Sequence, residues 1–272
     1  MGMMFADTGP PFAPTDSNHV ALKNFFLRVA DAPLSALLLD FDGTLAPFRV
    51  DPAAVRPWAG VRELLDRIRR TERTHVAIVS GRPAHQVATQ LDLETPVEIW
   101  GLHGAERLLP SGLVEHQELP RELTEGLRAA RQAIGDLDIS LRLEDKWNAL
   151  VVHWRGAARG FAALAETRTG EILTPFAELP GMSLLLFDGG IELRAGRDKG
   201  DAVRVLVESL PPGAPAAYLG DDATDEDAFE AIGDEGLSVL VRRAWRPTLA
   251  QVWVRPPAGL RAFLERWYRA VR

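Results

Sequence analysis

Short apolar runs that end in polar turns recur along the chain. Residues 36–39 precede the sequence DFDGT, residues 76–79 precede SGR, and residues 216–219 precede GDDATDED. Apolar runs of this length, bounded by turn signals, are typical of strands buried in a parallel sheet. Between the first two runs, VRELLDRIRRTER (61–73) has apolar residues at helical spacing, which predicts a strand–helix–strand unit. The pattern therefore predicts an α/β fold with a parallel sheet.

The middle of the chain has a different pattern. The stretches RELTEGLRAARQAIG and RGFAALAETRTG have helical spacing, whereas DISLRLE, NALVVHW, SLLLF and IELR read as strands, the last two joined by a turn that starts at Asp188. Two helices and four strands over residues 118–195 predict a compact α+β unit. Because the βα pattern resumes at Lys199, we expect a parallel-sheet core of residues 36–117 and 196–272 that is interrupted by this inserted domain.

Composition narrows the class of protein. The 272 residues include 31 basic and 38 acidic side chains, a net charge of −7, which argues against nucleic-acid binding because phosphate contacts need a basic face. The chain has no cysteine, so disulfides, zinc–thiolate sites and thiol nucleophiles are excluded, and a reducing cytoplasm fits.

Targeting and membrane signals are weak along the whole chain. We see no apolar run that approaches the roughly 18 residues of a membrane helix, and residues 1–20 lack the basic and apolar regions of a signal peptide. We interpret residues 1–20 as a loose arm, within an N-terminal lead-in of residues 1–35.

Two acidic residues follow the first predicted strand. Asp40 and Asp42 are two positions apart, so both side chains point to one side while Phe41 points to the other. Ligands of open α/β sheets bind beyond the carboxyl ends of the strands, and Gly43 permits a sharp turn there. A strand that ends in an ordinary Asp-Gly turn would have the same sequence. This motif alone therefore fits either a ligand site or a simple turn.

A second acidic segment follows the run at 216–219. Five acidic residues lie within 221–227, and they would repel one another unless they were solvated or bound a cation. Glu226 and Asp227 fit the first turn of a helix, where acidic side chains are favoured. Asp221 directly follows the strand and is the better metal ligand; carboxylate oxygens with water suit Mg²⁺.

Ser80 and Lys199 complete a pattern of polar groups at strand and helix ends. Ser80 follows the second predicted strand, and Lys199 opens a predicted helix. Singly, Ser80 fits a helix cap and Lys199 a solvated surface charge. A hydroxyl and an ammonium that face two carboxylates and Mg²⁺ form a phosphate site, and the four elements together are far more specific than any one.

These motifs resemble those of a known group of proteins. DFDGTL, SGR, the lysine of GRDKG and GDDATDED are similar to the four motifs of the haloacid dehalogenase superfamily of phosphohydrolases. GLHGAE, LRLEDK with VVHWR, and ELRAGRDKG resemble the trehalose-6-phosphate phosphatases within it, and the resemblance spans about residues 36–270. It implies a Rossmann-like parallel-sheet core with an inserted α+β cap domain, and hydrolysis of trehalose 6-phosphate through an aspartyl phosphate.

The resemblance also implies roles for individual residues. Asp40 would be the nucleophile, and Asp42 would protonate the departing sugar oxygen and then accept a proton from water. Mg²⁺ would be held by Asp40, the backbone carbonyl of Asp42 and Asp221. Support would come from Asp222 or Asp225. Ser80 and Lys199 would bind the transferring phosphoryl group.

Residues of the inserted domain would recognise the sugar. Arg142, Glu144 and Lys146 alternate along a predicted strand, so they share one face, which could also be an ordinary solvated face. The residues expected to contact substrate are Ser80, Gly81, Arg82, Glu144, Lys146 and Glu192, with His153 and Arg194 as weaker candidates. His103, in GLHG, is expected at the junction of core and cap, in either a structural or a functional role.

Two other functions fit part of the pattern. One is a phosphatase for a different sugar phosphate, such as sucrose 6-phosphate or mannosyl-3-phosphoglycerate, which only cap residues could distinguish. The other is a non-catalytic sugar-phosphate sensor, which the presence of both Asp40 and Asp42 disfavours. We therefore expect a cytoplasmic, monomeric enzyme with a small sugar-phosphate substrate and no nucleic-acid or membrane partner.

Overall fold

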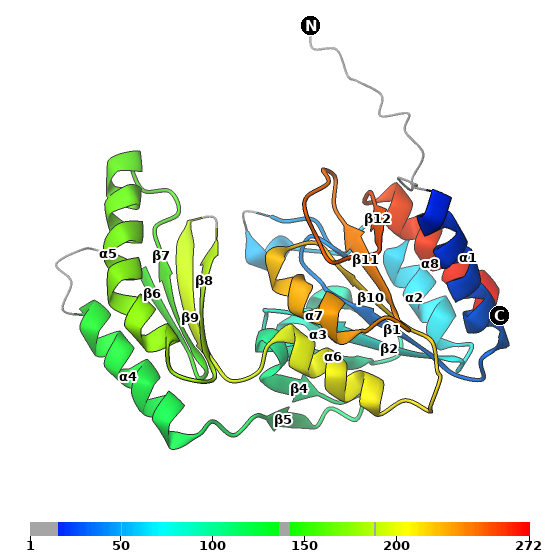
Figure 1. Cartoon of the computed structure of the whole chain (residues 1–272), viewed down its shortest axis with the longest axis horizontal. Coiled ribbons are helices and arrows are strands. Elements are labelled where there is room, and N and C mark those ends of the chain that lie inside the picture. Colours follow the sequence, from blue (N-terminus) through cyan, green and yellow to red (C-terminus); the bar gives the residue numbers. More distant parts are fainter. Residues whose placement is uncertain (1–15, 50, 136–141, 188) are drawn as a thin grey trace, which may run out of the picture. The chain divides into compact units, whose positions relative to one another are not determined.

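The chain folds into two compact units. A computed structural model describes residues 16–49, 51–135, 142–187 and 189–272. One unit, here the core unit, comprises the described residues up to Glu115 together with Asp198–Arg272; the other, the inserted unit, comprises the described residues of His116–Arg197. Figure 1 shows the elements of both, the inserted unit in green to yellow-green. Among the described residues, no helix combines the length and apolar character needed to cross a bilayer.

An eight-stranded sheet forms the centre of the core unit, in the order β12-β11-β10-β1-β2-β3-β4-β5. Its strands are β1 (Ser35–Leu39), β2 (Thr74–Val79), β3 (Glu98–Gly101), β4 (Glu106–Leu108), β5 (Val114–His116), β10 (Ala216–Gly220), β11 (Leu237–Val241) and β12 (Val252–Val254). The strands from β12 to β3 are parallel, and β4 runs antiparallel to β3. The predicted α/β fold with a parallel sheet is confirmed.

Helices cover both faces of this sheet. They are α1 (Asp16–Asp31), α2 (Val61–Arg69), α3 (Ala84–Leu91), α6 (Lys199–Glu208), α7 (Glu226–Ala231) and α8 (Ala258–Val271), with short 3₁₀ turns η1 (Pro52–Ala54), η2 (Leu102–Gly104) and η3 (Ala223–Asp225). Leu37 and Leu39 of β1 pack in the cluster that includes α1, α2, α3 and α8. Ala36 and Leu38 pack in the cluster of α6 and α7. Both faces of β1 are therefore buried, which explains its continuous apolar run.

Helix α1 includes residues 16–20, which belong to the predicted loose arm. Phe25 and Phe26 are buried, and both rings lie within about 6 Å of the Trp267 ring of α8, at 5.9 and 6.0 Å between centroids. This aromatic contact anchors the helix. Residues 1–15 of the predicted arm lie outside the described part of the chain.

The inserted unit is an antiparallel sheet with two helices on one face. The strand order is β6-β7-β9-β8. The elements are α4 (Arg121–Gly135), β6 (Arg142–Lys146), β7 (Ala149–His153), α5 (Arg159–Ala177), β8 (Met182–Phe187) and β9 (Gly190–Ala195). Leu150, Val152, Ile191 and Leu193 pack against residues of α4 and α5, so strand residues in the alternate positions occupy the opposite face. The predicted turn residue Asp188 lies outside the described residues.

Candidate active site

The topology brings the acidic motifs to one edge of the core sheet. Strand β1 pairs in parallel with both β2 and β10. The backbone N–H of Asp40 extends the ladder by donating to the Leu219 carbonyl at 2.8 Å, and the N–H of Ser80 donates to the Trp100 carbonyl at 2.8 Å. Asp40, Ser80 and Asp221 follow three neighbouring parallel strands, so all three residues lie at the carboxyl edge of the sheet.

Lys199 occupies the first turn of α6 and reaches into this edge. Its Nζ lies 2.7 Å from Oδ1 of Asp40 and 2.7 Å from Oδ1 of Asp225, and only 4% of its side chain is exposed. Burial disfavours the charged ammonium, but the carboxylates of Asp225 and Asp40 outweigh that effect and raise the pKa of Lys199 above its ordinary value. The lysine is therefore a buried cation between two acids, and not a solvated surface charge.

Asp225 organises the acidic loop that follows β10. Its Oδ1 accepts hydrogen bonds from Lys199 and, at 2.6 Å, from the Tyr218 hydroxyl. Its Oδ2 accepts from the backbone N–H groups of Asp221 and Asp222 at 2.9 and 3.0 Å. Four donors use both oxygens, so this carboxylate holds its neighbours in place. Sequence reasoning missed Tyr218; the signal was one hydroxyl-bearing residue in an otherwise apolar strand.

Asp221 packs tightly against the turn after β1. A side chain at Gly43, where φ is +85°, would place its Cβ 2.2 Å from Oδ2 of Asp221. Glycine at this position is thus required both by the left-handed backbone and by the close approach of the carboxylate.

The acidic side chains at this edge form a set that fits a cation. Carboxylate oxygens of Asp40, Asp221 and Asp225, all buried, lie within 4.8 Å of one another. Burial is the largest cause that raises the pKa of Asp40, to about 7, and that of Asp221, to about 9. The neighbouring carboxylates also contribute to raising both pKa values. Oδ2 of Asp40 is buried without a hydrogen-bond partner. Because the oxygens of Asp225 are already occupied, Asp40 and Asp221 are the carboxylates best able to ligate a divalent metal ion.

These pKa shifts predict how stability responds to pH and metal. A carboxyl whose pKa is higher in the folded state binds more protons there, so stability falls as pH rises from about 4 towards the raised values of about 7 and 9. Without metal, Asp221→Asn should therefore raise the melting temperature at pH 8 by several °C, since about 1 kcal/mol moves it by roughly 2–4 °C at this size. The gain should shrink towards pH 5.

Thermal melts of the two proteins in EDTA at both pH values test this, with the exposed Asp234→Asn as the control. Added Mg²⁺ should stabilise the parent more than Asp221→Asn. An unchanged or lower melting temperature for Asp221→Asn at pH 8 would contradict the assignment of repulsion to this cluster.

Asp42 is held by Arg82 on the neighbouring loop. Nε of Arg82 donates to Oδ2 of Asp42 at 2.5 Å, and Nη2 donates to Oδ1 at 2.7 Å. The remaining Nη1 donates to the carbonyl of Pro52 at 2.9 Å. This bidentate pair fixes the plane and direction of the Asp42 carboxylate. Arg82, predicted to contact substrate, thus contacts the predicted general acid.

His103 lies against the loop that carries Ser80. Its backbone N–H donates to the Ser80 carbonyl at 2.9 Å, and a Cβ at Gly81 would lie 2.6 Å from its Nε2. The residue is buried and has a positive φ of 59°. These contacts make His103 a support for the 80–82 loop, and they explain why Gly81 has no side chain.

In the inserted unit, the predicted sugar-contacting residues share one face. The register aligns Glu144 with Val151 and Val151 with Glu192, so Glu144 and Glu192 point the same way. Nζ of Lys146 lies 3.1 Å from Oε1 of Glu192. Oε2 of Glu144 lies 2.9 Å from Nε2 of His153. This polar face is opposite the one covered by α4 and α5.

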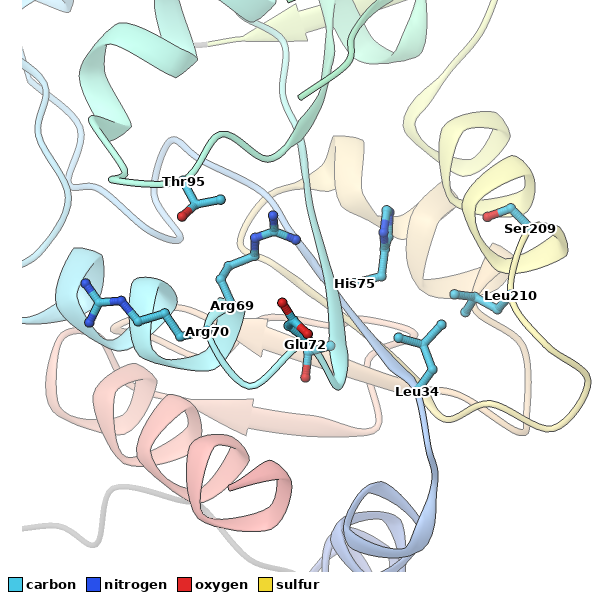
Figure 2. A pocket seen from close by; sticks show the side chains of 9 residues that line it. Leu34, Arg69, Arg70, Glu72, His75, Thr95, Ser209 and Leu210 are labelled. Atoms are coloured by element: carbon cyan, nitrogen blue, oxygen red, sulfur yellow. The ribbon is translucent and has the colours of Figure 1, made fainter. Parts of the chain in front are cut away.

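A large cavity lies at the other end of the core sheet. Its volume is about 530 Å³, and its lining includes Thr74 and His75 at the start of β2 with Arg69 and Arg70. Figure 2 labels Arg69, Arg70 and His75 among the side chains that line it. Arg69 ends α2, so its charge complements the negative end of that helix. Because this cavity lies at the start of β2, it does not include the candidate catalytic residues, which follow the carboxyl ends of the strands.

The fold and the site together define the class. A parallel α/β sheet with carboxylates, a serine and a lysine at its carboxyl edge, interrupted by an α+β unit, is of the haloacid dehalogenase type. A family model described as trehalose-phosphatase matches residues 38–250. The chain belongs to the trehalose-phosphatase family.

Individual relatives agree with this placement. A trehalose-phosphate phosphatase of Mycobacterium marinum is 33% identical over 252 residues, which cover 86% of this chain and 61% of that protein. The chain thus spans about three-fifths of the length of the curated relatives it matches. A solved "trehalose-6-phosphate phosphatase related protein" is 28% identical, with a TM-score of 0.63 over 85% of this chain and 96% of that one. A C-terminal domain from a C. albicans trehalose-6-phosphate phosphatase, 21% identical, shares the fold with a TM-score of 0.72 over 97% and 99% of the two chains.

Proposed function

We propose that this chain is a phosphatase that hydrolyses trehalose 6-phosphate to trehalose and phosphate, with Mg²⁺ and an aspartyl-phosphate intermediate. The observation that carries the proposal is the buried contact of Lys199 with Asp40 beside Asp221. Family membership and the printed names of the relatives support the substrate.

Asp40 is proposed as the nucleophile because it is the first aspartate of DFDGTL, which resembles one of the four motifs of the superfamily. Oδ1 is held by Lys199, whereas Oδ2 has no hydrogen-bond partner. An oxygen of Asp40 attacks phosphorus and forms a new O–P bond, and the bond from phosphorus to the sugar oxygen breaks. Water then attacks the phosphoryl group and the Asp40–phosphate bond breaks, which restores the carboxylate.

Asp42 is proposed to move the protons of both steps. It donates a proton to the departing sugar oxygen, and it later accepts one from the attacking water. Arg82 fixes the direction of the Asp42 carboxylate through two hydrogen bonds. Ser80, the backbone of Gly81 and the ammonium of Lys199 are proposed to bind the phosphoryl oxygens and balance their charge.

Asp40, Asp221 and the backbone carbonyl of Asp42 are proposed to hold Mg²⁺, with Asp225 and Asp222 in support. When bound, the ion would supply positive charge that stabilises the transferring phosphoryl group.

Residues 118–195 are proposed as a cap on the catalytic core of residues 36–117 and 196–272. An aspartyl phosphate needs controlled access of water, which a mobile cap provides. The polar face of the inserted sheet, with Glu144, Lys146 and Glu192, offers donors and acceptors suited to sugar hydroxyls.

Phosphate release from three sugar phosphates tests the proposal. Trehalose 6-phosphate, sucrose 6-phosphate and glucose 6-phosphate are compared with Mg²⁺ and with EDTA. Strong metal-dependent preference for the first supports the proposed function. Preference for another sugar would keep the chemistry and overturn the substrate. Release from none of them by a folded protein would favour the sensor.

Substitution of Lys146 should separate recognition from chemistry. Lys146→Ala should lower kcat/KM for trehalose 6-phosphate by about tenfold to a hundredfold, since a hydrogen bond to a charged group contributes about 1.5–3 kcal/mol. Activity on a small aryl phosphate should change little, because that substrate lacks the sugar.

The matched control is Asp145→Ala on the same strand, whose side chain contacts Arg131 of α4. It should affect both substrates equally. Equal losses for both substrates in Lys146→Ala would mean that this lysine serves stability and not recognition.

A further inference from the structure

The acidic loop is held by Asp225 from within the catalytic cluster and by a further group of contacts from outside it. The segment between β11 and β12, residues 242–249, is here named the strap; it lies in the orange loop of Figure 1. It makes hydrogen bonds and ion pairs with the loop of residues 221–226, which carries the metal-ligand candidate Asp221. The mechanism proposed above uses none of the strap residues.

Arg246 joins two points of the acidic loop. Its Nη2 donates to the backbone carbonyl of Asp222 at 2.7 Å. Its Nη1 lies 2.5 Å from Oε1 of Glu226, and 21% of the arginine side chain is exposed. One planar guanidinium thus connects the residue after Asp221 to the first turn of α7, with little freedom to move.

The remaining strap contacts converge on the same loop. Nη1 of Arg242 donates to the backbone carbonyl of Asp221 at 3.0 Å. Glu226 also accepts from the Thr248 hydroxyl at 2.8 Å and from the Leu249 N–H at 2.7 Å. Two consecutive carbonyls of the acidic loop are therefore fixed by arginines, on residues whose N–H groups are fixed by Asp225.

We propose that Arg246 is a positioning residue for the divalent cation: it fixes the acidic loop so that Asp221 is ready to ligate. This rests on the metal site of the proposed function, but not on its substrate. Partners of metal ligands usually affect metal affinity by about 10- to 100-fold. Arg246→Ala should therefore weaken cation binding about tenfold.

The sign of this effect separates positioning from simple charge. Removing a positive group beside five acidic residues would strengthen the attraction of a cation by Coulomb's law. A charge effect alone thus predicts tighter binding in Arg246→Ala, whereas positioning predicts weaker binding. A purely structural role predicts a lower melting temperature with unchanged affinity.

The experiment is a Mn²⁺ titration of the full chain without substrate, followed by the electron paramagnetic resonance signal of the free ion. Arg246→Lys, which can reach one of the two partners, should show an intermediate Kd. Arg269→Ala, which removes an exposed arginine of α8, is the matched control and should bind like the parent.

Weaker Mn²⁺ binding in a folded Arg246→Ala, with partial rescue by lysine, supports the proposal even if trehalose 6-phosphate is not a substrate. Equal or tighter binding would overturn it, and so would a parent protein that binds no Mn²⁺. If Arg246→Ala does not fold, Arg246→Lys decides: an unchanged Kd for the lysine variant would overturn the proposal.

Discussion

Asp40→Asn should lower turnover of trehalose 6-phosphate by about 10⁴-fold or more, the range seen when an enzyme loses its nucleophile. An amide oxygen cannot form the aspartyl phosphate, so the covalent route is closed. The fold should persist, because the asparagine oxygen can still accept from Lys199. Burial raises the pKa of Asp40 to about 7, so loss of its charge relieves a cost at neutral pH.

Phosphate release and thermal melts of Asp40→Asn measure the two effects, with the exposed Asp234→Asn as the control. Mass analysis of acid-quenched parent protein during turnover should find a phosphoryl group on Asp40. Turnover near the parental rate in Asp40→Asn would remove the nucleophile assignment. A phosphoryl group on another residue would move it.

The central strands could be predicted from the sequence because they are buried on both faces. The apolar runs at 36–39, 76–79 and 216–219 correspond to β1, β2 and β10 within two residues at either end. The edge strand β5 (Val114–His116) has three exposed residues, so no apolar run marks it. Its pairing depends on a neighbour and not on its own burial.

The candidate catalytic residues could be placed because each directly follows a strand or opens a helix. Asp40 and Asp221 are one residue past β1 and β10, and Lys199 opens α6. Parallel topology then brings such positions to one edge without further information. The motifs alone could not separate nucleophile from acid. The structure adds that Lys199 contacts Asp40 whereas Arg82 holds Asp42.

Residues that act through other residues could not be predicted. Arg246 reaches Glu226 across twenty positions of sequence, and Arg242 reaches Asp221 across twenty-one. Both lie in a loop whose composition resembles any exposed arginine-containing turn. Their partners follow from the pairing of β11 with β10, which aligns the loop after β11 with the acidic loop. The polar network therefore depends on tertiary structure in a way that the strands do not.

Lys199→Ala should destabilise the protein more than any other single substitution considered. It removes the cation between the buried carboxylates of Asp40 and Asp225, and an ion pair broken in this way costs about 3–5 kcal/mol. The pKa of Lys199 is raised in the folded state, so its contribution is fully present below its unfolded pKa, near 10, and is lost only at higher pH. The full cost should therefore appear at pH 8.

Lower pH should reduce that cost, because the Asp40 carboxylate left behind can take up a proton. Burial already raises the pKa of Asp40 to about 7 with the lysine in place, and removal of the lysine shifts it further in the same direction. Urea unfolding at pH 8 and pH 5.5 should show a larger loss at pH 8. Turnover should fall by about 10²–10³-fold even where the variant is folded, since one donor to the phosphoryl oxygens is missing.

Mg²⁺ distinguishes the two functions of this ammonium. A bound cation beside Asp40 can offset the repulsion between the carboxylates, so Mg²⁺ should recover part of the lost stability of Lys199→Ala. It should not recover turnover, because an ion held by Asp40 and Asp221 does not replace the N–H donors that the ammonium would offer to the phosphoryl oxygens. Lys23→Ala, at an exposed position of α1, is the matched lysine control and should change neither property. If Mg²⁺ restored both stability and turnover, Lys199 would be only a counter-charge for the acidic cluster, and the phosphoryl group would need another donor.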